Sequence, residues 1–315
     1  MTQHNKLKNF IFNKEEINKR IVYTILGMKF RHKKKKPLTL NEIKFYTTQM
    51  IKRTVPMPEL LSVQIDICDH CNLNCKSCDH FSPLAEKKHI AVEDFKKDFS
   101  QLAKISNKKI GRIILLGGEP LLHPNLLELV SITRKLFPNS EVEIFSNGIL
   151  LQTMKEEFWN CCRENNVIIA TTRYPINVDY EKIGQIAEKY SVQYICHGNK
   201  NERKTTNHFC IDMEGKQNPV ESFINCEAAN NCVMLKDGRL YTCTIAPNIK
   251  HFNKFFNKKL CLTDEDGINI YEARDMAEIL NFLARPIPFC KYCNVQCRTY
   301  GGHWEISKKQ IEEWI

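Results

Sequence analysis

Apolar and polar positions repeat with two alternating periods along the middle of the chain. Five short apolar runs have the spacing of strands, and the longer segments between them repeat apolar residues every three to four positions, as helices do. The strand-like runs are 62–67, 112–116, 141–145, 167–171 and 192–196, and the helical segments are 92–105, 125–136, 151–164 and 180–190. Such alternation predicts parallel βα units. Because about 140 residues cannot form a closed eight-unit barrel of ~250 residues, we predict an α/β fold, a partial (βα)6 TIM-like barrel.

The N-terminal region is predicted to be helical and is basic. Residues 13–28 and 40–51 are predicted as helices, the first because three isoleucines spaced four positions apart share one helical face. Residues 1–58 hold 14 Lys and Arg against three Glu, a charge of +11 within a chain total of +10. The rest of the chain is therefore nearly neutral, which makes a nucleic-acid partner unlikely on charge. Four consecutive lysines at 33–36 are compatible with weak contact between this segment and an anionic membrane surface.

The last third of the chain has a different pattern. Residues 233–236 and 239–241 are predicted as a β-hairpin, because the Asp-Gly between them accepts the positive φ angles of a two-residue turn. Helices are expected at 271–283 and 304–314. We therefore divide the chain into a basic N-terminal helical segment (1–58), the partial barrel (59–205), a small hairpin-and-helix domain (206–303) and a C-terminal helix (304–315).

Composition excludes two classes of protein. Charged residues make up 26% and apolar residues 43% of the 315 positions, values typical of a chain with a folded core. No stretch approaches the ~18 consecutive apolar residues of a spanning helix, and the first residues lack a secretory signal. We therefore expect a soluble, cytoplasmic protein.

The cysteine content indicates metal or redox chemistry. The chain has 15 cysteines, an odd number, and several of them are clustered. In a reducing compartment clustered cysteines are typical of metal sites rather than of a disulfide framework.

The densest cluster, Cys71-x3-Cys75-x2-Cys78, directly follows the first barrel strand. Active sites of parallel α/β folds form at the carboxyl ends of strands. Three thiolates on one short loop can bind three corners of a cubane iron–sulfur cluster and leave one iron open. A structural zinc site that also uses Cys68 is the alternative, but its two Cys-x2-Cys pairs would be unusually close together. We expect Cys68 to pack as a small apolar side chain.

Two further loops follow the next strands. Gly117-Gly118-Glu119-Pro120 ends the second strand; its glycines let the backbone approach a ligand closely, and Glu119 offers a carboxylate to a cation. Ser146-Asn147-Gly148 ends the third strand and is also compatible with an ordinary strand-to-helix turn. Arg173, Tyr174 and His197 follow strands four and five, where a substrate would face the site.

Together, the three-cysteine motif and Gly-Gly-Glu-Pro resemble the radical S-adenosylmethionine (SAM) superfamily over roughly residues 60–200. The resemblance implies a [4Fe–4S] cluster on Cys71, Cys75 and Cys78 whose fourth iron chelates SAM. Electron transfer then cleaves SAM to a 5′-deoxyadenosyl radical, which abstracts a hydrogen atom from substrate. It also implies that the 117–118 backbone and Glu119 hold the methionyl ammonium, with Ser146 and Asn147 near the ribose. The family often has an aromatic residue before the third cysteine, where this chain has Ser77.

A second group of cysteines occupies the C-terminal region. Cys226-x11-Gly238-x4-Cys243 resembles the SPASM and twitch auxiliary-cluster domains of the same superfamily, and the twitch form, with one cluster, fits the cysteine number better. The resemblance implies a second [4Fe–4S] cluster on Cys243, Cys290 and Cys293, with Cys226 or Cys232 as the fourth ligand and Cys297 as a bystander. A structural four-cysteine zinc site is the alternative.

The sequence therefore leads to the hypothesis of a radical SAM enzyme that oxidises or tailors a sugar-like or nucleotide-sugar substrate. Its reaction type would be that of an oxidoreductase or dehydrogenase. The run 78–84 resembles family members associated with surface-polysaccharide biosynthesis. A reductase or flavodoxin would supply electrons. The alternatives are a peptide-modifying radical SAM enzyme and a zinc-stabilised nucleic-acid-binding protein.

Overall fold

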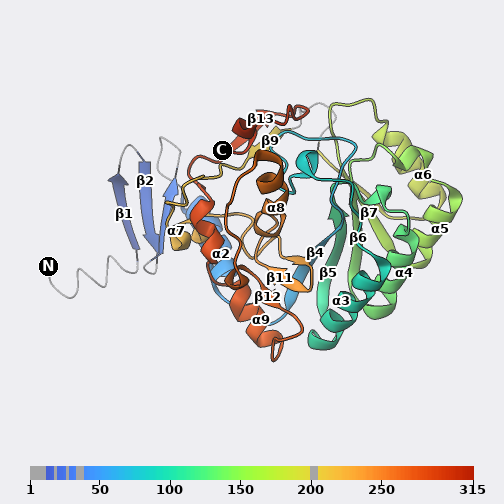
Figure 1. The fold of residues 1–315 in the computed structure, drawn as a ribbon, viewed down its shortest axis with the longest axis horizontal. Coiled ribbons are helices and arrows are strands. Elements are labelled where there is room, and N and C mark those ends of the chain that lie inside the picture. Colours follow the sequence, from blue (N-terminus) through green and yellow to red (C-terminus); the bar gives the residue numbers. More distant parts are fainter. Residues whose placement is uncertain (1–11, 18–19, 26–27, 33–38, 199–204) are drawn as a thin grey trace.

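A continuous eight-stranded sheet forms the centre of the protein (Figure 1). The structure, a computed structural model, describes residues 12–17, 20–25, 28–32, 39–198 and 205–315. The sheet has the order β12-β11-β10-β4-β5-β6-β7-β8, and its six strands from β10 to β8 run parallel. The five consecutive ones are β4 (Leu60–Cys68), β5 (Ile110–Gly117), β6 (Glu141–Ser146), β7 (Val167–Thr172) and β8 (Tyr194–His197). The predicted α/β fold class is confirmed, and each predicted barrel strand is present.

Four helices cover one face of this sheet (Figure 1). They are α3 (Val92–Ile105), α4 (Leu126–Leu136), α5 (Glu156–Glu164) and α6 (Tyr180–Lys189). The segment predicted as one helix over 151–164 is a 3₁₀ turn, η3 (Leu151–Thr153), followed by α5. The apolar stripes of the helices and the buried strand residues form one core, in which Val63, Ile113 and Ile144 have no exposed surface. Burial on both faces explains why β5 and β7 have continuous apolar runs.

The predicted hairpin exists, and it extends the barrel sheet. β10 (Met234–Lys236) and β11 (Arg239–Tyr241) pair around Asp237 and Gly238, both of which have positive φ. β10 also pairs in parallel with β4, with Met234 opposite Gln64 and Leu235 opposite Ile65, and β12 (Ile268–Asn269) adds to β11. The hairpin therefore brings the C-terminal cysteines to the first strand of the barrel.

The remaining C-terminal elements pack around this hairpin. They are α7 (Pro219–Ile224), α8 (Ile245–Phe256) and α9 (Met276–Leu283), the 3₁₀ turns η4 (Asp264–Asp266) and η5 (Pro288–Tyr292), and the paired strands β9 (Thr205–His208) and β13 (Thr299–His303). The sequence analysis did not predict α7, α8, β9, β12 or β13. The helix predicted from 271 begins at Met276, because Asp275 caps it by accepting from the Glu278 amide.

The helix predicted at 13–28 is wrong. The described residues there form an antiparallel sheet of β1 (Phe12–Ile17), β2 (Arg20–Ile25) and β3 (Met28–His32). Ile17 ends β1, whereas Ile21 and Ile25 both lie on β2, where a spacing of four fits one strand face as well as one helical face, because four is a multiple of two. The adjoining Val22 and Thr24 favour the strand. The run at 33–36 lies outside the described residues, whereas the helix predicted at 40–51 is confirmed as α2 (Leu40–Thr54).

The C-terminal helix predicted at 304–315 is also wrong. Residue Ile306 forms a β-bridge with Cys75, and the only regular turn in that described segment is the 3₁₀ turn η6 (Ile311–Glu313). The Lys76 amide donates to the Glu305 carbonyl at 2.9 Å, and the Ser307 amide to the Asn74 carbonyl at 2.8 Å. Backbone pairing with the cysteine loop thus overrides the local helical pattern.

Helices of the described segments are all too short or too polar to cross a membrane.

Candidate functional site

The first three cysteines line one cavity at the carboxyl ends of the barrel strands. Cys71, Cys75 and Cys78 lie on the loop after β4, and the cavity they line has a volume of about 780 Å³. Its wall also includes the four predicted residues Gly117, Gly118, Ser146 and Asn147. The structure therefore brings the three separate sequence motifs to a single site.

The C-terminal segment holds the cysteine loop in shape. Trp314 is fully buried, and its indole N–H donates to the Cys78 carbonyl at 2.9 Å. Asn74 and Ser77 have φ of 55° and 56°, left-handed values that turn the loop between successive cysteines. Ser77 donates to the Glu313 carbonyl at 2.5 Å and so faces the chain end. The position before the third cysteine therefore anchors the loop.

The two glycines of the second motif allow a close backbone approach. A Cβ on Gly118 would lie 2.0 Å from the His70 carbonyl oxygen, and one on Gly117, whose φ is +125°, would lie 2.3 Å from the Cys68 carbonyl oxygen. The Gly118 amide donates to that Cys68 oxygen at 2.7 Å. Only glycine fits this contact, which fixes the end of β5 against the start of the cysteine loop.

Glu119 connects the second and third motifs from a fully buried position. Its carboxylate accepts from the Ser146 hydroxyl at 2.8 Å, the Asn147 amide at 2.9 Å and the Leu121 amide at 3.1 Å. The side chain of Asn147 then donates to the Asn72 side chain at 2.7 Å and lies 3.6 Å from the Cys71 sulfur. This chain of contacts joins β5, β6 and the cysteine loop. Direct contact of Glu119 with a methionyl ammonium stays a prediction.

Burial raises the pKa of Glu119 from 4.5 to about 7, although the three donors to its carboxylate oppose that rise. The folded state therefore binds this proton more tightly than the unfolded state. The resulting stabilisation is complete below pH 4.5 and is lost as the pH rises through 7, a change of about 3 kcal/mol.

We expect Glu119→Gln to remove this pH dependence. The difference in unfolding free energy between the native protein and the variant should shrink by about 3 kcal/mol from pH 4.5 to 8, measured by urea titration. At pH 4.5 the variant should be about 1–3 kcal/mol less stable than the native protein, because its amide opposes the Asn147 amide donor, and by pH 8 this deficit should be gone or reversed. Parallel pH profiles for the two proteins would show that Glu119 does not titrate in this range.

The three loop thiols suit a cluster better than a single zinc ion. Among the described residues, they do not form a group whose ligand atoms all lie within 4.8 Å of one another. Tetrahedral zinc at ~2.3 Å from each sulfur needs sulfurs roughly 4 Å apart, whereas a cubane holds its thiolates farther apart. Burial raises the pKa of Cys71 and of Cys78, so an adjacent cationic centre is needed to keep them as thiolates. The donor set therefore fits an iron–sulfur cluster.

Aromatic side chains from distant segments complete the cavity wall. Tyr174, which follows β7, contributes a side-chain hydrogen bond to Cys75, and burial raises its own pKa. Its ring centroid lies 5.6 Å from that of Trp304. His197 stacks on Phe145 with centroids 5.7 Å apart, and both line the cavity. Tyr174 and His197 are thus at the site as expected, whereas Trp304 was missed because it lies on the segment predicted as a helix.

The C-terminal cysteines form a separate buried group. Burial and, to a smaller extent, the neighbouring Cys226 thiol raise the pKa of Cys243 to about 12. Burial and the thiols of Cys243 and Cys226 also raise the pKa of Cys290 and of Cys293. These four cysteines therefore lie close to one another, next to the Arg298 guanidinium, which is 3.7 Å from the Cys226 sulfur.

The other candidate cysteines are placed differently. Cys232 lines the 780 Å³ cavity of the three-cysteine loop, and burial followed by Asp79 raises its pKa to about 12. Cys297 is exposed and accepts from the Asn294 side chain at 3.1 Å. Cys226 and Cys243 also raise the pKa of Cys232, so Cys226 or Cys232 as the fourth member of the C-terminal group stays a prediction. Cys68 is fully buried, as expected.

Comparison with known proteins identifies the central part of the chain. Residues 65–194 match the family model described as the Radical SAM superfamily. This region is a radical SAM domain, and the match indicates an enzyme. GTP 3′,8-cyclase of Clostridium perfringens (strain 13 / Type A) is 27% identical over 140 residues, 43% of this chain and 42% of the relative. GTP 3′,8-cyclase of Microcystis aeruginosa is 30% identical over 104 residues, 32% of this chain and 31% of the relative. The chain therefore spans well under half the length of these relatives.

Solved structures with a similar arrangement are less alike in sequence. BtrN in complex with AdoMet and 2-DOIA is 18% identical with a TM-score of 0.47, and the match covers 76% of this chain and 94% of that one. Native anSMEcpe with bound AdoMet and Cp18Cys peptide is 19% identical with a TM-score of 0.35, covering 44% of this chain and 42% of that one.

Proposed function

We propose that this protein reductively cleaves SAM at a [4Fe–4S] cluster held by Cys71, Cys75 and Cys78, and abstracts a hydrogen atom from a bound substrate. The observation that carries this proposal is the shared cavity. Its wall combines three thiols that leave room for an open iron with the glycine backbone after β5 and the polar turn after β6. When bound, the cluster supplies the electron that breaks the SAM carbon–sulfur bond.

The residues around the cavity have distinct supporting roles. The backbone at Gly117 and Gly118 provides polar groups without side-chain bulk, which suits the methionyl end of SAM. Asn147 places an amide beside the Cys71 sulfur and is itself fixed by Glu119. Tyr174 and Trp304 shield one side of the cavity from water. Such shielding protects a reactive radical from side reactions.

Polar groups on the cavity wall support a hydroxyl-rich substrate. Glu143, which is 4% exposed, lies 3.5 Å from the Arg112 guanidinium, and both line the cavity together with Gln64 and His197. Carboxylate, amide and imidazole groups can donate to and accept from sugar hydroxyls. We therefore keep oxidation or tailoring of a sugar-like or nucleotide-sugar substrate as the first choice, with peptide modification as the alternative. A reductase or flavodoxin remains the proposed electron donor.

The second part of the proposal is an auxiliary [4Fe–4S] cluster on Cys226, Cys243, Cys290 and Cys293. Its support is the mutual proximity of four buried thiols. Such a cluster would accept the second electron of a two-electron oxidation. These cysteines also fail to form a group with ligand atoms within 4.8 Å in the described chain, which disfavours the zinc alternative.

Iron counting after anaerobic reconstitution tests both assignments together. We expect about eight irons per chain, and about four in the Cys293→Ala variant and in the Cys75→Ala variant. Cys293→Ala should keep some SAM cleavage that is uncoupled from substrate, provided the variant folds. About four irons in the native protein, with zinc making up the difference, would refute the auxiliary cluster and leave the first cluster in place.

A further inference from the structure

A cysteine and two histidines converge next to the three-cysteine loop but belong to neither cluster. One ligand atom from each of Cys68, His70 and His89 lies within 4.8 Å of the other two. The Cys68 sulfur is 3.2 Å from His70 Nδ1, and the rings of His70 and His89 meet edge to face with centroids 4.9 Å apart. Among the described residues this is the one such convergent group of His, Cys, Asp or Glu ligands.

The backbone holds these side chains in place. Cys68 and His89 form an antiparallel β-bridge, although they are separated by the whole cysteine loop. The Asp69 amide donates to the Lys88 carbonyl at 3.0 Å, and the Ile90 amide donates to the Ile67 carbonyl at 3.1 Å. The convergence therefore results from fixed main-chain pairing and does not depend on side-chain rotamers alone.

One ring nitrogen in the group lacks the partner that burial normally requires. Nε2 of His89 is buried and makes no hydrogen bond to any described residue. A buried polar atom without a partner costs about 1–3 kcal/mol, so it calls for an explanation. The neighbouring His123 differs, because its Nε2 contacts the Ile90 carbonyl at 2.9 Å and its Nδ1 accepts from the Asn125 amide.

We propose that Cys68, His70 and His89 form a third metal site, which binds a zinc ion. One thiolate and two imidazoles are a typical zinc donor set, and a water molecule would complete the tetrahedron. On binding, the Cys68 thiol loses its proton to solvent, a sulfur–zinc bond forms and the metal keeps its oxidation state. The ion gives His89 Nε2 the partner that the described protein atoms do not provide.

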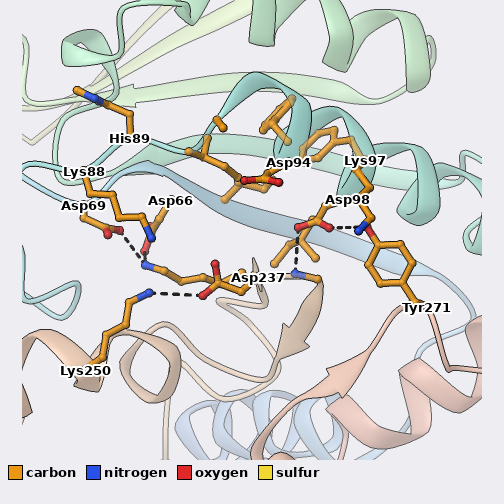
Figure 2. Close-up of a pocket in the computed structure, with 18 residues that line it drawn as sticks. Asp66, Asp69, Lys88, His89, Asp94, Lys97, Asp98, Asp237, Lys250 and Tyr271 are labelled. Atoms are coloured by element: carbon orange, nitrogen blue, oxygen red, sulfur yellow. Dashed lines mark hydrogen bonds and ion pairs between the residues drawn. The ribbon is translucent and has the colours of Figure 1, made fainter.

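A pocket borders this site at His89. Its volume is about 480 Å³, and His89 and Lys88 form part of its wall. Figure 2 shows His89 at the margin of the pocket, on the side opposite Tyr271. The pocket wall also includes Lys236, which pairs with Asp66 and Asp69. A hydrated ion can therefore approach the site from the side of His89.

The position of the site indicates what the ion does. Cys68 ends β4, and its carbonyl holds Gly118, while Cys71 follows three residues later. A metal bridge between 68–70 and His89 fixes the base of the loop that carries the first cluster. Zinc here acts as a structural clamp on that loop, and this role does not depend on which substrate the enzyme uses.

The test measures zinc and iron in the same sample of reconstituted holoenzyme, dialysed against micromolar zinc. We expect one zinc per chain in addition to the iron. X-ray absorption spectroscopy at the zinc edge should show one sulfur at ~2.3 Å and two imidazole nitrogens at ~2.0 Å from the zinc. Cys68→Ser and His89→Gln should each lose this zinc and keep the native iron content. The matched control His123→Gln should keep both metals.

Three results would overturn the proposal. They are the absence of zinc in the holoenzyme, a zinc shell made only of sulfurs, and full zinc retention in His89→Gln. If Cys68→Ser does not fold, His89→Gln still tests the proposal. His89 Nε2 makes no hydrogen bond to the described residues, so this substitution removes none at that atom.

Discussion

Replacing Cys75 with alanine should reduce SAM cleavage to the level of an enzyme-free control. Cys75 is the middle thiol of the loop, and its partners Cys71 and Cys78 line the same cavity. With two thiolates left, a cubane loses a corner ligand as well as the contact with Tyr174. The measurement is 5′-deoxyadenosine formed from SAM under dithionite, quantified per chain.

The matched control for this variant is Cys161→Ala. Cys161 is a half-buried cysteine on α5 that belongs to neither cysteine group, and its sulfur contacts the Leu127 carbonyl and the side chains of Asn165 and Ser131. We expect this variant to keep native SAM cleavage and native iron content. Unchanged cleavage in Cys75→Ala would contradict the assignment of the first cluster.

Replacing Lys236 with methionine should destabilise the fold by about 3–5 kcal/mol, the largest stability effect we expect. The Lys236 ammonium, on the hairpin, lies 3.3 Å from Asp66 and 3.0 Å from Asp69 and is itself 8% exposed. Burial alone would raise the pKa of Asp66, but His80 and Lys236 lower it overall. Without Lys236, Asp66 keeps His80 at 2.8 Å but loses its ammonium partner, and Asp69 loses the same ammonium. Urea unfolding of the apoprotein gives the loss in free energy.

Two comparisons isolate the buried ion pair. Lys250→Met removes an exposed lysine that lies 3.4 Å from Asp237 and should cost less than about 1 kcal/mol. Adding Asp66→Asn to Lys236→Met should recover part of the loss, because one of the two carboxylates that shared the Lys236 ammonium is gone. Equal destabilisation by Lys236→Met and Lys250→Met would contradict the importance of the buried pair.

Much of the barrel could be predicted from the sequence because its elements are buried with clear periods. β5 has continuous apolar residues and lies between layers, and α3 begins and ends where the pattern indicated. The N-terminal segment failed for the opposite reason. The spacing of Ile21 and Ile25 fits a strand and a helix equally, and packing of Tyr23 and Ile25 against Met50 decides between them.

The candidate site was partly predictable for a similar reason. Motifs that directly follow strands meet at one edge of a parallel sheet, so the loops at 71–78, 117–119 and 146–147 converge as expected. Residues joined only by long-range contacts gave no local signal. Trp304 reaches the site through chain pairing that spans more than 160 residues, and the contact of Lys236 with Asp66 becomes apparent only in the folded protein.

The most direct test of the central claim is electron–nuclear double resonance on the reduced enzyme with SAM labelled at its amino nitrogen and carboxylate oxygens. We predict hyperfine coupling of both labels to the reduced cluster, and its loss in Cys75→Ala. Bound SAM that shows no coupling to the cluster from either label would contradict an open iron on the 71–78 loop.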